Sequence, residues 1–228
     1  YTLSLLVAFP YGNHAVAAQL PIGEGDKFRG VADIIHMKAF VWNDASGKNV
    51  TESPIPDELA DAALELREKL VEYAAESDEE LLNKYLEGEE LTQEEFERGL
   101  ATGVADGSVV PVFCASGLRM VGVKPLMDSI VALLPSPVAH GAVTGRLPGS
   151  EDKAQRRPDE AEPFSALVFK TMADPYVGKI TMFRVYSGIV KSDSQVYNAS
   201  KDRVERFGQV FLIKGKHQIA VAQVSGGD

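Results

Sequence analysis

The stretch between residues 57 and 106 constrains the fold of this chain most, because its pattern fits an α-helix. Apolar side chains recur at steps of four, three, four and four residues: Leu59, Ala63, Leu66, Leu70 and Ala74. These steps place them on one face of a helix with 3.6 residues per turn. Pro56, Asp57 and Glu58 suit the first turn of such a helix. We therefore predict an amphipathic helix that begins near Asp57.

Two capping boxes predict further helix starts within the same stretch. Ser77-Asp-Glu-Glu80 and Thr92-Gln-Glu-Glu95 each place a Glu three residues after a hydroxyl side chain. In that arrangement the two side chains satisfy backbone N–H groups that the start of a helix leaves free. Gly88 favours a helix end between them. The acidic residues lie on the outward face, so we predict an acidic helical subdomain.

The residues before the helices predict a small β-sheet. Residues 15–22 form a short apolar run, and residues 28–42 form a longer run with a break at Gly30. A turn at Asn43–Lys48 follows, rich in Asn, Asp, Ser and Gly. This pattern favours a sheet that contains a hairpin.

A strand, a loop and a helix are predicted after the helical stretch. The strand is Val109–Cys114, the loop is residues 115–122, and the helix is Val123–Leu134. This order is typical of a nucleotide-binding α/β sheet, although any α/β layer produces it. Residues 138–163 hold several Gly and Pro residues, a charged run and no apolar period, so we predict a linker there.

The region from residue 164 onward predicts an all-β module. Apolar runs alternate with turn residues: Phe164–Met172, Ile180–Val190, Gln195–Asn198, Val204–Ile213 and Ile219–Val224, with a turn at Asp174–Gly178. Short strands at near-regular spacing are typical of a small barrel or sandwich. We expect an incomplete Greek-key barrel over residues 164–228.

Charge is distributed unevenly along the chain, whose net charge is −10. Residues 51–106 carry 18 Asp and Glu against 4 Lys and Arg, whereas residues 164–228 carry 5 against 9. This asymmetry predicts two modules with different partners. Apolar runs are too short to span a membrane, and the single cysteine, Cys114, excludes an internal disulfide and fits the cytoplasm. The chain begins with Tyr1, and we expect it to be an internal part of a longer protein.

Sequence motifs for catalysis or metal binding do not occur in this chain, so no catalytic or metal-binding residue is predicted. The phosphate-binding P-loop pattern is absent; Gly23–Lys27 resembles it, but has the wrong spacing and two acidic residues. Asp44–Gly47 and Asn83–Leu86 resemble GTPase motifs, but they fall in a predicted turn and inside a helix. Cys114 ends an apolar strand and is read as a small buried residue.

Three groups of residues together resemble the elongation factor G family of translational GTPases. Phe28–Ala39 (FRGVADIIHMKA) resembles a strand region of the insert in its GTPase domain. Val112–Leu118 (VFCASGL) and Gly122–Asp128 (GVKPLMD) resemble the last strand, guanine loop and last helix of that domain. The barrel motifs resemble the second domain: Glu162–Lys170 (EPFSALVFK), Asp174–Gly178 (DPYVG), Phe183–Gly188 (FRVYSG) and Glu205–Gly208 (ERFG).

The resemblance implies a domain organisation. Residues 1–137 would be the C-terminal part of a GTPase domain with its α+β insert at about residues 14–106. Residues 138–163 would be the linker, and residues 164–228 a truncated second domain. The family hydrolyses GTP, with Mg²⁺, on the ribosome during translocation. The phosphate-binding parts would precede Tyr1, so we expect neither GTP hydrolysis nor tight GTP binding by this chain alone.

The resemblance also implies site residues and partners. Ser116, Gly117 and Leu118 match the guanine loop, with Gly117 where the family usually has Ala. The acidic helical insert would face the ribosomal stalk protein, and the barrel would contact small-subunit ribosomal RNA. Cations that suit RNA phosphates are Arg184, Lys191, Lys201, Arg203 and Arg206. Some of these, Arg206 especially, have the alternative of pairing with acids of the same protein.

Two alternatives stay open at this point. The chain can be a ribosome- or factor-binding module without a catalytic role, or it can come from a divergent paralogue or a ribosomal protection protein without translocase activity. Ser116-Gly117 and the stretch Lys191–Gln195 depart from the family pattern and favour a divergent copy.

Overall fold

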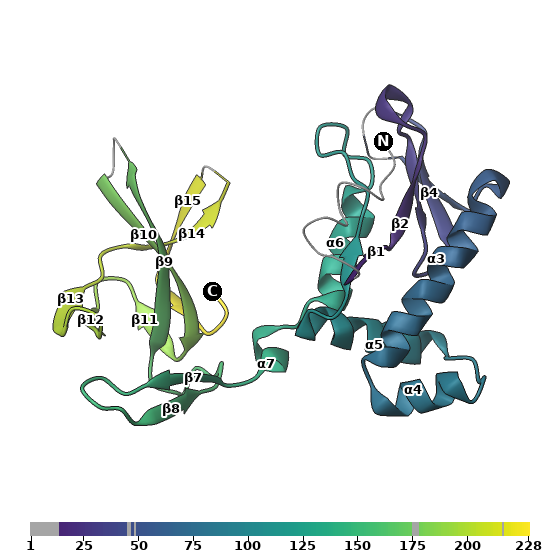
Figure 1. Cartoon of the computed structure of the whole chain (residues 1–228). Coiled ribbons are helices and arrows are strands. Elements are labelled where there is room, and N and C mark those ends of the chain that lie inside the picture. The colour runs from purple at the N-terminus through teal and green to yellow at the C-terminus, as the bar shows by residue number, and fades with distance from the viewer. Residues whose placement is uncertain (1–13, 45–46, 48, 175–177, 216) are drawn as a thin grey trace. The chain divides into compact units, whose positions relative to one another are not determined.

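The chain folds into two compact units, Tyr1–Leu134 and Pro135–Asp228. The computed structural model describes residues 14–44, 47, 49–174, 178–215 and 217–228. Each unit is described separately below, with the element labels of Figure 1. None of the described helices is both long and apolar enough to cross a bilayer.

A four-stranded antiparallel sheet forms one part of the first unit. Its strands follow chain order: β2 (Gln19–Ile22), β3 (Gly30–Asp33), β4 (Lys38–Trp42) and β5 (Val50–Ser53). The predicted break at Gly30 is wrong, because Gly30 begins β3 and pairs with both Ile22 and Val41. Pairing on both sides outweighs the low strand propensity of glycine. A short 3-10 helix, η2 (Gly25–Lys27), connects β2 and β3.

A parallel strand pair connects distant parts of the first unit. β1 (Ala15–Ala17) pairs with β6 (Val110–Val112), so residues 95 positions apart in the sequence lie side by side. α6 (Val123–Leu133) follows β6 after a loop. The predicted strand–loop–helix order is confirmed, although the strand ends at Val112 and not at Cys114. The predicted turn at Asn43–Lys48 includes residues outside those described.

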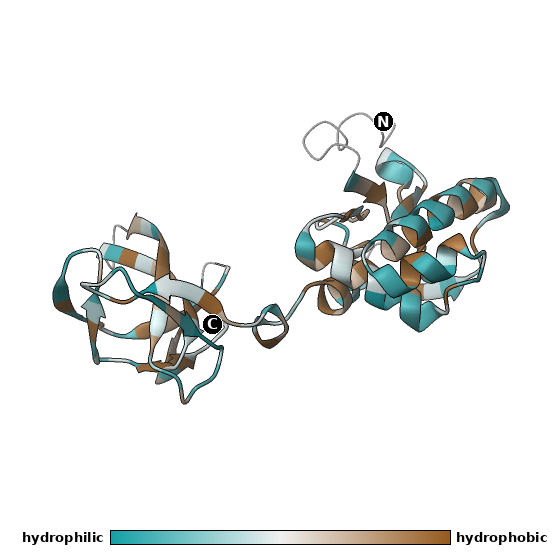
Figure 2. Ribbon diagram, turned by 60° about the horizontal axis from the view of Figure 1, so that its bottom comes forward, coloured by the Kyte–Doolittle hydropathy of each residue, from teal (hydrophilic) through white to brown (hydrophobic). Residues whose placement is uncertain are grey.

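Three helices complete the first unit: α3 (Asp57–Glu76), α4 (Glu79–Leu86) and α5 (Gln93–Asp106). Residues of the predicted apolar face, Ala63, Leu70 and Ala74, are fully buried, and they join Phe96 and Leu100 of α5 in the main core. The opposite face is hydrophilic, as Figure 2 shows. The predicted helical structure of residues 57–106 is confirmed.

The start of α4 differs from the prediction. Asp78 caps this helix, because its carboxylate accepts hydrogen bonds from the backbone N–H groups of Glu80 and Leu81, at 2.9 and 3.3 Å. The predicted capping box at Ser77 is therefore wrong. Ser77 Oγ donates instead to the carbonyls of Ala74 and Gly99, at 2.8 and 2.7 Å, and so connects α3 to α5.

The capping box at the start of α5 is confirmed. Thr92 Oγ1 accepts from the Glu95 N–H at 3.3 Å, and Glu95 accepts from the Thr92 N–H at 2.7 Å. Lys84 Nζ also donates to both carboxylate oxygens of Glu95, at 2.9 and 2.8 Å. These hydrogen bonds lower the pKa of Glu95 to about 2, and the bond from Lys84 has a larger effect than those from Thr92. The contacts connect α4 to α5.

The lowered pKa of Glu95 predicts a pH-dependent contribution to stability. The contribution is complete above the ordinary carboxyl pKa of about 4.3 and is lost as the pH falls towards about 2. In circular-dichroism melts at pH 6, we expect the wild-type protein to have a higher melting temperature than Glu95→Gln. This difference in melting temperature should shrink steadily between pH 4.5 and 2. Glu94→Gln is the control, because the Glu94 carboxylate has no partner among the described residues. A difference independent of pH would contradict the prediction.

The second unit is rich in β-structure. Its antiparallel pairs are β9 (Ser165–Asp174) with β10 (Gly178–Ser187), β11 (Ile189–Lys191) with β16 (Gln223–Ser225), β12 (Gln195–Asn198) with β13 (Arg203–Arg206), and β14 (Val210–Lys214) with β15 (His217–Val221). Val185, Val190, Val210 and Val224 form its core, against which three phenylalanine rings pack. The predicted barrel is confirmed only as a β-rich unit, because the described strands do not close into a barrel. The predicted turn at Asp174–Gly178 includes residues outside those described.

The segment predicted as a linker contains regular structure. α7 (Pro137–His140) begins the segment, and β7 (Val143–Arg146) pairs with β8 (Lys153–Arg156) in a hairpin. The segment predicted as a linker, residues 138–163, therefore contains a short helix and a hairpin. The hairpin buries little, and its polar strands therefore have no apolar alternation to detect in the sequence.

Candidate functional site

The loop between β6 and α6 is held at both ends. Ser116 and Val121 form an antiparallel bridge, in which the Ser116 N–H donates to the Val121 carbonyl at 2.8 Å. The Cys114 N–H donates to Gln19 Oε1 at 3.2 Å. Arg119 Nη1 donates to the Asp26 carbonyl at 2.9 Å, which connects the loop to η2. These contacts fix the base of the loop, residues 114–122.

The tip of this loop is accessible. Ser116 is half-buried, whereas Gly117 and Leu118 are exposed, Leu118 by 97%. No atom lies near the position of a Cβ on Gly117. Within the described part of the chain, the backbone N–H groups of Gly117 and Leu118 donate no hydrogen bond. The tip therefore presents two backbone donors on a fixed base, an arrangement that can bind a carbonyl oxygen of a ligand.

Gln19 was not identified from the sequence. Its side chain is 1% exposed, and its oxygen accepts from the Cys114 backbone. Its Nε2 is a buried polar atom without a hydrogen-bond partner among the described residues. The sequence feature that could have pointed to Gln19 is its position as a single amide within an apolar strand. A polar side chain that is buried there normally has a structural or binding role. Burial raises the pKa of the neighbouring Cys114 thiol, which disfavours the reactive thiolate.

Three of the five predicted RNA-binding cations pair with acids of their own unit. Lys201 and Arg203 both contact Glu205, at 3.3 and 2.8 Å. Hydrogen bonds from Asn198 first, and then from Arg203 and Lys201, lower the pKa of Glu205 to about 2. Arg206 pairs with Asp193 at 3.2 Å, as the sequence alternative anticipated. These pairs reduce the positive charge that the three cations can offer to a partner.

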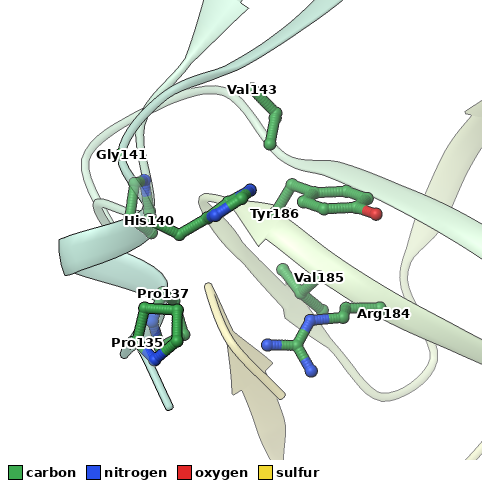
Figure 3. A pocket seen from close by; sticks show the side chains of 9 residues that line it. Pro135, Pro137, His140, Gly141, Val143, Arg184, Val185 and Tyr186 are labelled. Carbon is green, nitrogen blue, oxygen red and sulfur yellow. The ribbon is translucent and has the colours of Figure 1, made fainter. Parts of the chain in front are cut away.

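The other two cations, Arg184 and Lys191, have no side-chain partner among the described residues. Both are exposed, at positions in β10 and at the end of β11. Arg184 also lines a pocket of about 200 Å³ within the second unit (Figure 3). These two side chains are the strongest candidates for contact with an anionic partner.

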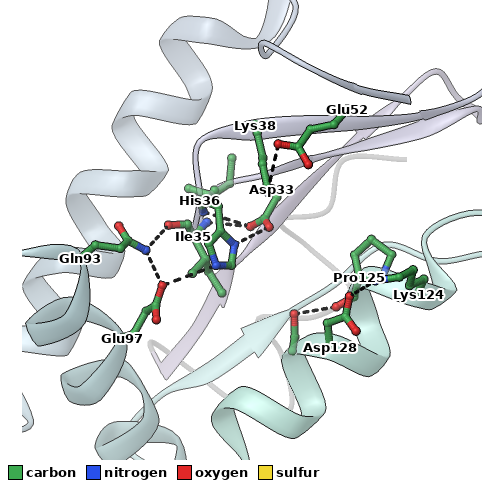
Figure 4. Close-up of polar contacts among 12 residues, drawn as sticks. Asp33, Ile35, His36, Lys38, Glu52, Gln93, Glu97, Lys124, Pro125 and Asp128 are labelled. Atoms are coloured by element: carbon green, nitrogen blue, oxygen red, sulfur yellow. Dashed lines mark hydrogen bonds and ion pairs between the residues drawn. The ribbon is translucent and has the colours of Figure 1, made fainter. Parts of the chain in front are cut away.

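The acidic helices carry few internal ion pairs. Lys69 pairs with Glu65 and Lys84 with Glu95, which leaves most carboxylates of the subdomain exposed. In the turn between β3 and β4, His36 lies between Asp33 at 2.7 Å and Glu97 at 3.5 Å (Figure 4). These contacts connect the sheet to α5. No group of three or more His, Cys, Asp or Glu side chains suited to a metal ion occurs within the described residues.

Comparison with known proteins identifies the second unit. Residues 163–228 match the family model for elongation factor G domain 2. A crystal structure of a protein from Thermus thermophilus has 29% sequence identity and a TM-score of 0.70 over 94% of this chain. The second unit is therefore similar to domain 2 of elongation factor G. This confirms the family resemblance read from the barrel motifs.

Both matches relate the chain to a translation elongation factor by similarity. The chain spans 29% of the length of the Thermus protein. No site residue is assigned by either match. The loop at Ser116 and the two unpaired cations therefore enter the function only as proposals.

Proposed function

We propose that this chain is a ribosome-binding part of an elongation factor G-type GTPase that works in ribosomal translocation in the cytoplasm. The observation that carries the proposal is the elongation factor G domain 2 at residues 163–228. The separation of charge supports it, because an acidic helical subdomain and a unit with unpaired cations suit two different partners.

The nucleotide contact proposed for the whole protein is the loop Ser116–Leu118. GTP, with Mg²⁺, would supply the phosphoryl group that is hydrolysed. The backbone N–H groups of Gly117 and Leu118 fit the carbonyl oxygen of guanine, because they are exposed and unpaired within the described residues. Since phosphate contacts supply much of the affinity for a nucleotide, this loop alone is expected to bind GTP weakly and to hydrolyse none.

Two ribosomal partners are proposed. Arg184 and Lys191 would contact phosphates of small-subunit ribosomal RNA, because each is an exposed cation without an internal partner among the described residues. The carboxylates of α3, α4 and α5 would face the stalk protein. Dissolved salt screens the attraction between exposed charges, so both contacts should weaken as the salt concentration rises.

Binding to purified small ribosomal subunits tests the proposal. We expect the 228-residue chain to sediment with the subunits, with an affinity that falls as salt rises. Lys191→Gln should weaken binding by about three- to tenfold and lower the salt slope by about 0.7 to 1, the effect of one lost phosphate contact. Lys153→Gln, in the β7–β8 hairpin, is the charge-matched control and should change little.

Two results would contradict this assignment. Wild-type chain that does not sediment with small subunits at low salt would remove the ribosomal role of the second unit. Equal affinities for Lys191→Gln and Lys153→Gln would remove Lys191 from the contact while leaving binding itself intact.

A further inference from the structure

We propose that the pocket of the second unit binds a single unstacked nucleotide of RNA, with its base against Tyr186 and its phosphate at Arg184. The pocket lies between the segment around α7 and strand β10 (Figure 3). This inference rests on the proposed function, since that function makes RNA the partner of this unit. It goes beyond that function in naming the site and the part of the RNA that enters it.

The walls of the pocket suit one flat ring. Apolar groups make up most of the lining: Pro135, Pro137, Val143, Pro158 and Val185. The volume of about 200 Å³ equals the share of roughly six or seven liquid waters. It is smaller than the pockets of about 300 Å³ or more that hold drug-sized ligands. The space has the size of one base, and the rest of an RNA strand would lie outside it.

Polar side chains enter the same space from both walls. His140 projects from α7 towards Tyr186, and the guanidinium of Arg184 lies on the β10 side (Figure 3). Neither Arg184 nor the His140 ring has a hydrogen-bond or ion-pair partner among the described residues. The guanidinium offers up to five N–H donors, and the imidazole offers at least one in either protonation state. The pocket therefore combines free donors with an aromatic ring.

The chemistry of these groups selects a nucleotide over other anions. Bases of single-stranded RNA stack on aromatic side chains, and Arg pairs with their phosphates in a fork-like geometry. An acidic peptide would use Arg184 and His140, but its carboxylates have no flat face to place on Tyr186 and the prolines. None of the nine lining residues is acidic, so a phosphate meets no repulsion from the wall.

The backbone of the pocket is held in place without a ligand. The Val185 N–H donates to the Asp228 carbonyl and the Gly227 N–H donates to the Val185 carbonyl, both at 2.9 Å. On the other wall, Ser136 caps α7 by accepting from the Ala139 N–H at 3.1 Å. A site that is already ordered loses less conformational entropy on binding. This makes capture of one nucleotide feasible for a small pocket.

Fluorescence anisotropy with labelled decauridylate and the full 228-residue chain tests the inference. We expect Arg184→Gln to weaken binding by about tenfold or more, the effect of losing a charged phosphate contact. Lys179→Gln removes the same charge from the same strand outside the pocket, and should weaken binding by at most about twofold. Melting curves of both variants establish that the unit stays folded.

A second pair of variants tests the stacking of the base. Tyr186→Leu keeps an apolar side chain but removes the ring, and should weaken binding by about five- to hundredfold. Tyr186→Phe keeps the ring and should bind within about twofold of wild type. A role of Tyr186 in folding alone would lower the melting temperature of the Leu variant without this difference in affinity between folded proteins.

The combined results of the sedimentation and decauridylate experiments show whether the pocket inference or the proposed function fails. If wild-type chain sediments with small subunits but Arg184→Gln and Lys179→Gln bind decauridylate equally, the pocket inference fails and the ribosomal role stands. Displacement of decauridylate by deca-glutamate at equal concentration would also overturn it, because the site would then recognise charge alone. If wild-type chain binds decauridylate through Arg184 and Tyr186 but not small subunits, the pocket stands and the ribosomal role fails.

Discussion

Replacing Arg67 by methionine is expected to lower the free energy of unfolding of the first unit by about 3 kcal/mol. Arg67 Cζ lies 3.7 Å from the centroid of the buried Phe96 ring. Its guanidinium also donates to the Ile34 and Ile35 carbonyls and, at 2.9 Å, to Gln93 Oε1. One side chain of α3 therefore connects the end of β3 to α5.

The cost arises because methionine fills the same space without making these hydrogen bonds. Hydrogen bonds that involve a charged group contribute about 1.5 to 3 kcal/mol, and a partly desolvated cation–π contact adds up to about 2 kcal/mol. Burial lowers the pKa of Arg67, because its charge is partly removed from water. Arginine stays charged in proteins, so the guanidinium depends on the carbonyls for solvation.

Urea unfolding measured by tryptophan fluorescence tests this prediction. Trp42 is the single tryptophan of the chain and is buried in the first unit, so its signal reports on that unit. Lys69→Met, two residues along α3, is the matched control and should change the midpoint little, because the pair of Lys69 with Glu65 is exposed. A midpoint for Arg67→Met equal to that of Lys69→Met would contradict the connecting role of Arg67.

Replacing Gly122 by alanine is expected to destabilise the first unit by about 3 kcal/mol or more and to displace the Ser116 loop. Gly122 precedes α6 and has φ +75°, a conformation that costs other residues about 1 kcal/mol or more. A Cβ at this position would lie 2.3 Å from the Cys114 carbonyl oxygen and 3.2 Å from the Ala115 Cα. Both are backbone atoms, so the loop has to move.

A substitution at a second glycine, Gly107, distinguishes the cost of a positive φ from the cost of steric overlap. Gly107 ends α5 with φ +83°, and no atom lies within 4 Å of a Cβ placed there. Gly107→Ala should therefore cost only about 1 kcal/mol in the same Trp42 fluorescence measurement. Amide hydrogen exchange at Ser116, whose N–H donates to the Val121 carbonyl, reports the loop itself and should become faster in Gly122→Ala alone. Equal costs for the two variants would show that the overlap at Cys114 does not matter.

Features that depend on near neighbours in the chain were predicted well. The apolar period of α3 and the capping box of α5 involve residues within a few positions, and both were confirmed. Pairing of Arg206 with an acid of the same protein was an open alternative, and the structure shows that this acid is Asp193, 13 residues away. The start of α4 was missed because Ser77 is engaged by the Gly99 carbonyl, 22 residues away, which leaves Asp78 to cap the helix.

For the candidate sites, the sequence predicted which types of residue take part, but not which of them lack a partner within the protein. The sequence proposed five cations and singled out only Arg206 as one that could pair with an acid. It could not distinguish Arg184 and Lys191 from Lys201 and Arg203, which Glu205 engages. Nor could it detect the β7–β8 hairpin, because two polar strands that bury little have no apolar pattern. The incomplete closure of the β-strands likewise depends on pairings that composition does not encode.

By itself, the sequence determined the helices of residues 57–106, the separation of acidic from basic segments and the relation to elongation factor G. Each of these depends on neighbouring residues or on short motifs. Only the tertiary structure decided that Gln19 holds the Cys114 backbone across 95 residues, and that Arg184, Tyr186 and His140 share one pocket. The physical reason is that local periodicity acts along the chain, whereas these contacts form only after distant segments pack together.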